Sequence, residues 1–293
     1  MTDPGAEVAV LTWNMFHGRD HPPDAGLHTW RSRLLRVTER NATHVQVNRS
    51  LLDEFAGLLA EGPWSICLLQ EVPPLWAEPL AERCRAEAHR VLTSRNQLAP
   101  LRRCLGRWNP DLMGSWEGGS NVTLVRRPWR IAERGDVLLN PLLRRAFRER
   151  RRMALTTVTS GGADLSVGNL HASAGSRAQA EQDVRYGAER ALAFAGRRPL
   201  VLGGDFNLRP RTSPVFDELE RRFGFTAPAA DDAIDHLLAR GLEVLERPHR
   251  WPPEARERTA GLHPWGPGRL RLSDHAPVEA VFRTPPPVVG LLP

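Results

Sequence analysis

The sequence predicts an α+β fold or a layered α/β sandwich. Strand-like apolar segments follow one another as hairpins in several places, and only a few helical segments lie between them. This order differs from the regular strand–helix alternation of a doubly wound parallel sheet. The chain contains neither a Gly-x-Gly-x-x-Gly loop nor a Walker loop. Since no repeat or linker divides it, we predict a single domain of residues 1–283.

The N-terminal half is predicted to alternate between strands and helices. Residues 7–13 alternate in polarity and are rich in Val and Leu, which indicates a strand. Residues 49–60 place their leucines on one helical face, with Asn48 as the cap. Two prolines open a further helix from Pro73 to Ala88. We expect other strands at 65–69, 89–93, 121–126 and 131–139, a short helix at 31–40, a loop at 16–28, and a loop with some helix at 94–117.

The C-terminal half is predicted to begin with a hairpin, since residues 153–159 and 164–170 flank Gly161-Gly162. Strands are expected at 200–202, 233–238, 242–246 and 276–282, and helices at 176–194 and 215–223. Gly203 and Gly204 follow the first of these strands and are expected to turn the chain at the sheet edge. Residues 284–293 are rich in proline and are predicted to form a frayed tail.

Composition narrows the class of protein. The 293 residues are 41% hydrophobic, enough for a sizeable core, and no apolar run is long enough to span a membrane. Three cysteines without metal-type spacing, and an N-terminus without a secretory pattern, favour a reduced cytoplasmic protein, which we expect to be a monomer. The net charge of +6 comes entirely from arginine, which indicates either biased coding or a phosphate-rich partner.

Short polar clusters stand at the ends of the predicted strands. Each alone has a structural explanation as a turn, a helix cap or a buried histidine. Together, their residue types are difficult to attribute to caps. The clusters are Thr12-Trp13-Asn14, Leu69-Gln70-Glu71, Asn169-Leu170-His171, Gly204-Asp205-Phe206-Asn207, Ile234-Asp235-His236 and Ser273-Asp274-His275.

This series, in this order, resembles the endonuclease/exonuclease/phosphatase superfamily, and the match extends from about Val8 to Phe282. The resemblance implies a four-layer α/β/β/α sandwich with two packed mixed β-sheets. It also implies cleavage of a phosphoester with Mg²⁺, or alternatively Mn²⁺, as the cofactor.

The resemblance and the chemistry of these side chains together suggest roles. Hard divalent cations prefer oxygen ligands, so Glu71 is the expected main metal ligand, helped by Asn14 and Asp274. Asp205 and Asn207 would orient the attacking water or support a second ion. His275 and Asp235 would form a histidine–carboxylate pair, and His171 would contact a phosphoryl oxygen.

Two further residues, Asn121 and Arg152, are predicted to contact substrate. Packing is the alternative for Asn121, and a solvated charge is the alternative for Arg152. Arginines are dense at 126–130 and 144–152, and both clusters are predicted to contact substrate phosphates.

The substrate class stays open at this point. A nuclease is favoured because the chain is basic, although Trp108 and Trp116 are the few candidates for base stacking. The alternative is a phosphatase or phosphodiesterase of a small-molecule, inositol or lipid phosphoester. The lipid case is less favoured because no amphipathic membrane segment is recognised. A non-catalytic binding module ranks last, because every expected site residue is present.

Overall fold

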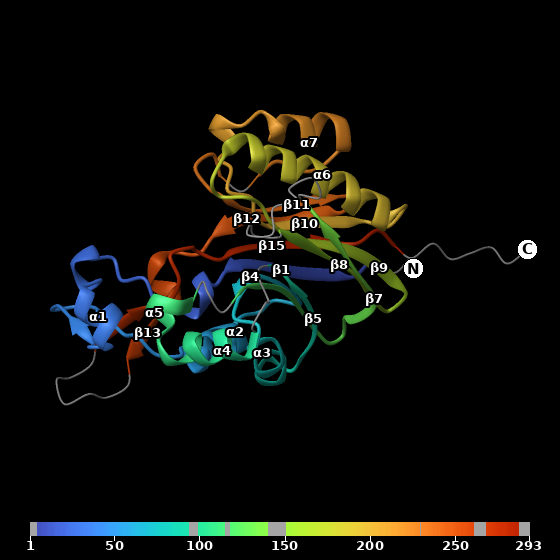
Figure 1. Cartoon of the computed structure of the whole chain (residues 1–293). Helices are drawn as coiled ribbons and strands as arrows, with labels where there is room; N and C mark the ends of the chain where they lie inside the picture. The colour runs from blue at the N-terminus through green and yellow to red at the C-terminus, as the bar shows by residue number, and fades with distance from the viewer. Residues whose placement is uncertain are drawn as a thin grey trace, which may run out of the picture.

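The computed structural model describes residues 5–93, 99–114, 118–139, 151–228, 230–260 and 268–286. Two mixed β-sheets lie face to face, and helices cover the outer side of each sheet (Figure 1). The four-layer α/β/β/α prediction is therefore confirmed. The six-stranded sheet has the order β12 (Glu243–Arg250), β15 (Val278–Arg283), β1 (Glu7–Asn14), β4 (Ile66–Val72), β6 (Ser120–Arg126), β5 (Ala86–Leu92). The five-stranded sheet has the order β11 (Asp235–Arg240), β10 (Leu200–Asp205), β9 (Ala163–His171), β8 (Arg152–Ser160), β7 (Arg130–Leu138).

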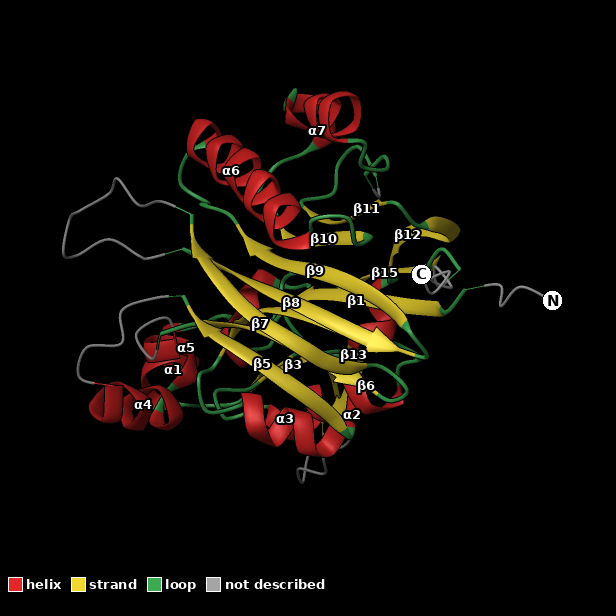
Figure 2. Ribbon diagram, turned by 90° about the vertical axis from the view of Figure 1, so that its right-hand side faces the viewer, coloured by secondary structure: helices red, strands yellow, loops and turns green. Residues whose placement is uncertain are grey.

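The helices bury their apolar faces on the outer sides of the sheets. Helices α2 (Leu52–Glu61) and α3 (Ala77–Cys84) cover the six-stranded sheet, and α6 (Arg177–Ala195) and α7 (Val215–Phe223) lie on the other side (Figure 2). Three small buried residues of α6, Ala180, Ala188 and Ala191, let this helix approach its sheet closely. No helix in the described part of the chain has the length and apolar character needed to cross a membrane.

The inner faces of the sheets form the central core. Alternate residues of β1 and β4, such as Val10 and Leu68, pack against Val167 and Val201 of the other sheet, all without solvent exposure. Gly203 lies inside β10 at this interface, where an added Cβ would stand 2.8 Å from Leu68 Cδ1. A side chain at this position would push the sheets apart.

One buried polar link also joins the two sheets. Nε2 of Gln70 donates a hydrogen bond to Oδ1 of Asn169 at 2.8 Å. The Asn169 amide in turn donates to the carbonyl oxygens of Leu69 and Val122, each at 3.1 Å. Because these groups are fully buried, the link is satisfied only in one relative position of the sheets. It therefore fixes the alignment of the strand ends that follow.

Smaller elements gather at the end of the sandwich where β1 and β4 finish. They lie at the left of Figure 1, opposite the end where β1 begins and β15 finishes. They are η1 (Phe16–Gly18), η2 (Ala25–Leu27), α1 (Trp30–Leu35), β2 (Glu39–Arg40), β3 (Val45–Gln46), α4 (Ala99–Trp108), α5 (Pro110–Met113), η5 (Pro253–Arg256), β13 (Glu257–Ala260) and β14 (Gly268–Arg271). The short η4 (Pro210–Thr212) precedes α7.

Several predicted boundaries were wrong, for local reasons. The helix from Pro73 to Ala88 is only α3, because Arg85 adopts a left-handed conformation with φ of 53° and β5 starts directly after it. The helix at 31–40 likewise stops at Arg36, with φ of 58°. The stretch at 94–117, which was predicted as a loop with some helix, contains α4 and α5 within its described residues.

Two further corrections concern the central strand and the C-terminus. Gly203 and Gly204 do not turn the chain at the sheet edge but belong to β10, which continues to Asp205. Gly204 has φ of 139°, and an added Cβ would lie 1.9 Å from the carbonyl oxygen of Leu170. The predicted tail starts too early, since Thr284 is buried and its Oγ1 accepts a hydrogen bond from the Ala6 amide. Residues 287–293 lie outside the described part of the chain.

Candidate active site

The polar strand ends converge at one edge of the sandwich. Asp205, at the end of β10, pairs in register with His171 on the parallel strand β9 and with Asp235 on the antiparallel strand β11. In the other sheet, Asn14 ends β1 beside Gln70 of β4. Because parallel strands finish at the same edge, residues that are distant in the sequence become neighbours.

Asp205 is the centre of the cluster. Its Oδ2 accepts a hydrogen bond from Nδ2 of Asn14 at 2.9 Å, and this contact bridges the two sheets. Its Oδ1 accepts from the Asn207 backbone amide at 2.9 Å. Burial and the nearby charge of Asp235 raise the pKa of Asp205 to about 7, although His275 and Asn14 oppose this shift. Its carboxyl therefore holds a proton more readily than an exposed aspartate does.

His275 and Asp235 form the predicted pair. Nδ1 of His275 lies 2.8 Å from Oδ2 of Asp235, and it is the donor because the carboxylate can only accept. Burial lowers the pKa of His275, but the charge and hydrogen bond of Asp235, together with Asp205, raise it overall to about 10. Nε2 of His275 faces Oδ2 of Asp205 and Oδ1 of Asp274, each at 3.9 Å.

The loop that carries His275 is held from several directions. Nη1 of Arg256 donates to the carbonyl oxygens of Ser273 and His275, at 2.6 and 2.8 Å. Nε1 of Trp13 donates to the same His275 carbonyl at 2.9 Å, and the Ser273 hydroxyl donates to the Asn14 carbonyl at 2.7 Å. The imidazole thus sits on a fixed backbone.

Glu71 is placed by an irregularity in its strand. The pairing of β4 with β6 shifts register between Leu69 and Val72, and Glu71 has φ of 51°. Its carboxylate keeps 21% side-chain exposure. Its Oε1 lies 3.6 Å from Nε2 of His171, and its Oε2 lies 3.3 Å from Nε2 of His17.

Left-handed backbone conformations are concentrated around this site. Outside glycine, the described residues with positive φ are Phe16, His17, Arg36, Glu71, Arg85, Asn207 and Ser273. Arg36 and Arg85 simply terminate helices, whereas the other five adjoin the cluster. Unfavourable backbone geometry of this kind is typical of functional sites, where the surrounding structure enforces it.

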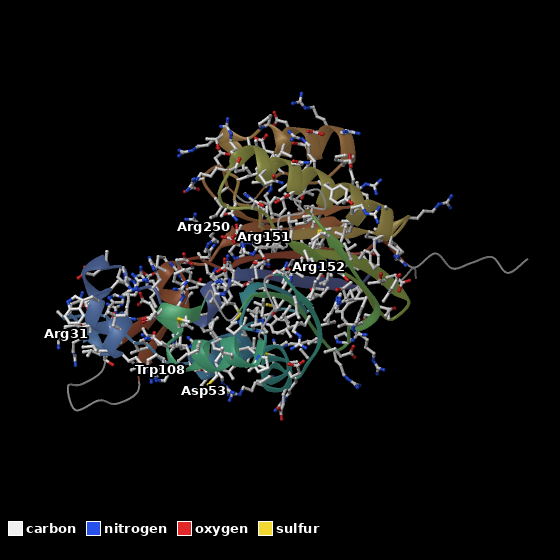
Figure 3. The ribbon with its side chains drawn as sticks, in the orientation of Figure 1. Arg31, Asp53, Trp108, Arg151, Arg152 and Arg250 are labelled. Carbon is white, nitrogen blue, oxygen red and sulfur yellow. The ribbon has the colours of Figure 1, made fainter. Side chains whose placement is uncertain are left out.

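His171 is buried and neutral. Burial, together with the charges of Arg151 and His275, lowers the pKa of this imidazole well below its usual value. Nη1 of Arg151 lies 2.6 Å from Nδ1 of His171. Arg151 precedes β8 and is labelled beside Arg152 in Figure 3. Arg151 belongs to the 144–152 cluster that was predicted to contact substrate phosphates, but its burial beside His171 was not predicted.

His17 was also missed, because it lies in a stretch that was read as loop. Nothing in its local sequence identifies it. Its contact with Glu71 depends on the left-handed conformation of Phe16 and His17 in η1.

The donor set fits a hard divalent cation. Glu71 and Asp274 offer carboxylate oxygens that are partly open to solvent, and both charges act to raise the pKa of the neighbouring Arg19, which burial lowers overall. Asp205, Asp235 and His275 also bring potential ligand atoms within 4.8 Å of one another. In that trio, however, Nδ1 of His275 is already bonded to Asp235. The carboxylates of Glu71 and Asp274 are therefore the better-suited ligands.

The two predicted substrate contacts, Asn121 and Arg152, both have partners within the protein. Asn121 is fully buried, and its Nδ2 donates to the backbone oxygens of Arg152 and Asn169, at 2.9 and 3.2 Å. This favours the packing alternative. Arg152 forms an ion pair with Asp136 of the adjacent strand β7. Residues 140–150 lie outside the described part of the chain, and so does Trp116.

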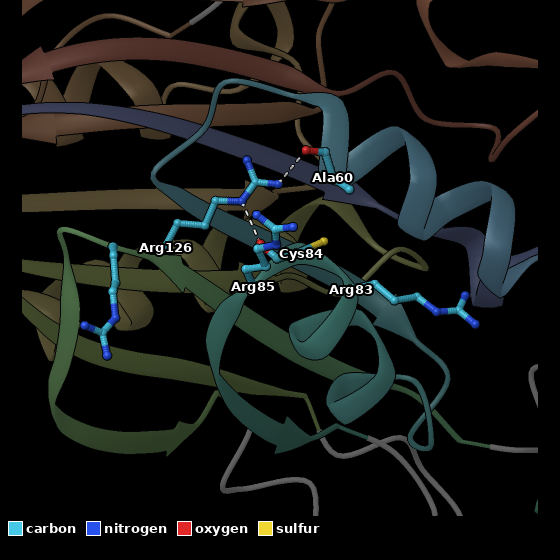
Figure 4. A pocket seen from close by; sticks show the side chains of 6 residues that line it. Ala60, Arg83, Cys84, Arg85 and Arg126 are labelled. Atoms are coloured by element: carbon cyan, nitrogen blue, oxygen red, sulfur yellow. Dashed lines mark hydrogen bonds between the residues drawn. The ribbon is translucent and has the colours of Figure 1, made fainter.

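The arginine cluster at 126–130 is not at the site, so that prediction was wrong. Arg126 lies at the opposite end of β6, where its amide donates to the Ser65 carbonyl before β4 begins. Its guanidinium lies over the Trp64 ring and donates to the carbonyl oxygens of Leu59, Ala60, Gly62 and Cys84. It lines a pocket of about 620 Å³ with Arg83, Arg85 and Arg127 (Figure 4). Arg126 therefore closes the C-terminal end of α2 and does not face the site.

His236, the sequence rival of His275, packs in the core. Its ring centroid lies 5.3 Å from that of Phe206 and 4.7 Å from that of Phe216, and Nε2 contacts the Leu208 carbonyl at 3.1 Å. Burial lowers the pKa of His236 to about 4. It is therefore a buried, neutral side chain.

Solved structures share this fold at low sequence identity. An endonuclease/exonuclease/phosphatase family protein from Bacteroides thetaiotaomicron is 14% identical, with a TM-score of 0.64, covering 96% of this chain and 98% of that one. A mannosyl-6-phosphatase of the same organism is 14% identical, with a TM-score of 0.63, covering 94% of this chain and 99% of that one. Truncated Caenorhabditis elegans TDP2 is 17% identical, with a TM-score of 0.56, covering 95% of this chain and 98% of that one.

Comparison with curated protein sequences finds no significant match. The model of the Endonuclease/Exonuclease/phosphatase family matches residues 11–275, a range that includes all the strand-end clusters from Asn14 to His275. The family model, the four-layer fold and the convergent site lead to the same assignment. The chain therefore belongs to the endonuclease/exonuclease/phosphatase family of phosphoester hydrolases.

Proposed function

We propose that this chain hydrolyses a phosphodiester bond with the help of a divalent cation, Mg²⁺ in the first place and Mn²⁺ as the alternative. The observation that carries the proposal is the network around Asp205. This carboxyl joins Asn14 of one sheet to Asn207, His171 and the His275–Asp235 pair of the other. Such a network places groups that bind, orient and exchange protons around one small volume.

The chemistry of each site residue determines its proposed role. Glu71, Asn14 and Asp274 would hold the cation, and bound Mg²⁺ supplies the positive charge that an anionic phosphate requires before a nucleophile approaches. Asp205 and Asn207 orient the attacking water. His275, fixed by Asp235, presents Nε2 to the reacting group, and the neutral His171 donates a hydrogen bond to a phosphoryl oxygen.

Nucleic acid is the first substrate class we propose. The net charge of +6 and the guanidinium of Arg151 beside His171 support it, because arginine binds phosphate well. The 126–130 cluster does not support a nucleic-acid substrate, because it lies far from the site. A second candidate, an amphiphilic phosphoester, is favoured by exposed apolar side chains on α1 at the same end of the sandwich. The cytoplasmic location and monomeric state remain predictions.

A substrate panel tests the proposal. The purified chain is assayed with Mg²⁺ and Mn²⁺ against plasmid, abasic duplex, single-stranded DNA, RNA, a phosphoinositide and an aryl phosphodiester. Asp205→Asn, which keeps the side-chain volume, is the matched control for contaminating activity. Cleavage of a nucleic acid that is lost in Asp205→Asn supports the nuclease. Turnover of the phosphoinositide alone would replace it with the second candidate, and no turnover of any substrate would contradict both.

A further inference from the structure

The apolar side chains that the structure leaves exposed are all in one region. In the described ranges, the exposed large hydrophobic residues are Trp30, Leu34, Leu35, Leu101, Trp108 and Leu112, and their exposed fractions run from 38% to 65%. They belong to α1, α4 and α5, and we call them the apolar face. An apolar surface this concentrated usually marks a docking site, because isolated exposed leucines are scattered over most proteins.

The three helices are neighbours at the active-site end. Asn109, which caps α5, donates from Nδ2 to the Arg33 carbonyl of α1 at 2.6 Å, and α4 runs directly into this cap. In Figure 1, α5 lies between α1 and α4. In Figure 3, Arg31 lies at the left edge of the molecule, and Trp108 lies lower, between Arg31 and Asp53. Gly114, after α5, approaches His17 of the site, with an added Cβ 3.5 Å from the His17 Cβ.

Helix α4 is amphipathic, and part of its apolar side faces outward. Leu101, Cys104 and Trp108 are spaced by three and four residues, so they form one stripe, and all three are exposed. Trp30 and Leu34 form a similar stripe on α1. No amphipathic membrane segment was recognised from the sequence, whereas the structure forms an amphipathic helix at residues 99–108.

The charge of these helices is positive. Their sequences contain Arg31, Arg33, Arg102, Arg103 and Arg107 and a single acid, Asp111. Asp111 is turned inward and accepts a hydrogen bond from Gln46 at 2.5 Å. Trp and Leu beside arginine are the composition of a helix that lies on an anionic lipid surface, where arginine contacts headgroups and the apolar side chains enter the acyl boundary.

Other occupants fit less well. Four of the six exposed side chains are leucines, which provide no ring for base stacking, so a nucleic-acid platform is disfavoured. A symmetric dimer through this face would bring arginines against arginines without opposing carboxylates. We propose that the apolar face docks the protein onto an anionic membrane surface. This goes beyond the proposed function, because it concerns where the enzyme binds and is measured without turnover.

Cys104 provides a built-in reporter of docking. It is the exposed cysteine of the chain, whereas Cys67 and Cys84 are buried, and burial raises the pKa of both their thiols. An environment-sensitive dye should therefore react selectively at Cys104. Addition of phosphatidylcholine vesicles containing phosphatidylglycerol should shift the dye emission to the blue, and pure phosphatidylcholine vesicles should have little effect. Cys104→Ser should remain unlabelled.

Sedimentation of the unlabelled protein with the same vesicles gives the affinities. We expect Leu101→Gln/Trp108→Ala to bind the anionic vesicles at least about tenfold more weakly. Trp108→Phe should retain most of the binding. Each of Arg31→Gln, Arg33→Gln and Arg107→Gln should weaken it about fivefold. The matched control is Arg190→Gln/Arg197→Gln/Arg221→Gln, in the opposite helical layer, which should bind as the parent does.

Four outcomes would overturn the proposal. Equal vesicle binding by the apolar-face and control variants, or no vesicle binding by the parent protein, would exclude docking onto a membrane. A dye response to duplex DNA but not to vesicles would make the face a nucleic-acid surface. A dye response that grows with protein concentration would show that the apolar face binds a second copy of the chain. Circular dichroism confirms that each variant is folded, and phosphoesterase activity plays no part in the result.

Discussion

The His275–Asp235 pair provides the sharpest test of the site. The perturbations are His275→Ala, Asp235→Asn and the double variant. The two residues are 40 positions apart and meet through one hydrogen bond, from Nδ1 to Oδ2 at 2.8 Å. If the carboxylate acts only by holding and charging the imidazole, its removal has no further effect once the imidazole is absent.

The expected magnitudes follow from that contact. Loss of a positioned acid–base group lowers kcat by about 10²–10⁴-fold, which sets the expectation for His275→Ala. A hydrogen bond between charged groups contributes about 1.5–3 kcal/mol, which corresponds to about 10–150-fold for Asp235→Asn. The coupling energy of the cycle should be of the same size, about 1.5–3 kcal/mol. The double variant should then resemble His275→Ala.

Single-turnover kinetics on the best substrate of the panel would measure the four corners of the cycle. His236→Leu is the matched control, because His236 packs against Phe206 and Phe216 away from the cluster. It should affect thermal stability while kcat stays near the parent value. Strictly additive losses, or a mild His275→Ala effect beside a severe His236→Leu effect on kcat, would refute the pairing.

Three other predictions follow from single contacts. Glu71→Gln should lower turnover at ordinary Mg²⁺ at least about a hundredfold without changing the circular dichroism spectrum, because the amide is a poorer ligand; full activity at low metal would contradict this. Arg126→Met keeps an unbranched side chain but removes the guanidinium that lies over Trp64 and bonds to the end of α2, so denaturant titration should show a loss of about 1–3 kcal/mol in the free energy of unfolding with unchanged kcat. Asn169→Leu should cost about 2–4 kcal/mol of unfolding free energy, because it removes the buried hydrogen bond from Gln70 and the two that the Asn169 amide donates to Leu69 and Val122, and a neutral result would show that this link does not align the sheets.

The layered fold could be predicted because its signals are local. Strand patterns and hairpin turns depend on neighbouring residues, and β8 and β9 fall close to the predicted hairpin. Helix ends were less predictable, because Arg36 and Arg85 terminate helices in a conformation that usually signals glycine. The role of Gly203 was also inaccessible, since the side chains that exclude a Cβ there, Leu237 of the adjacent strand and Leu68 of the other sheet, are distant in the sequence.

The site was predictable where its residues stand at strand ends. Asn14, His171 and Asp205 meet because register carries them to one edge, and the sequence shows that each follows an apolar strand. Arg151 and His17 were not predictable, because their positions depend on tertiary packing and on left-handed backbone rather than on a motif. The charge of an arginine is visible in a sequence, whereas its burial is not.

The strand-end residues of the site and the apolar face lie in different parts of the molecule, and this separation has a consequence for substrate specificity. The chemistry lies on strand ends that the Gln70–Asn169 link holds in register, so substitutions on α1 or α4 should leave it intact. Among the described residues, the helices of the apolar face approach the site at its rim, where Gly114 lies near His17 and His17 contacts Glu71. A change of docking partner would thus alter which phosphoester arrives, while the machinery around Asp205 stays the same. This is how a single site can serve many phosphoesters within one fold.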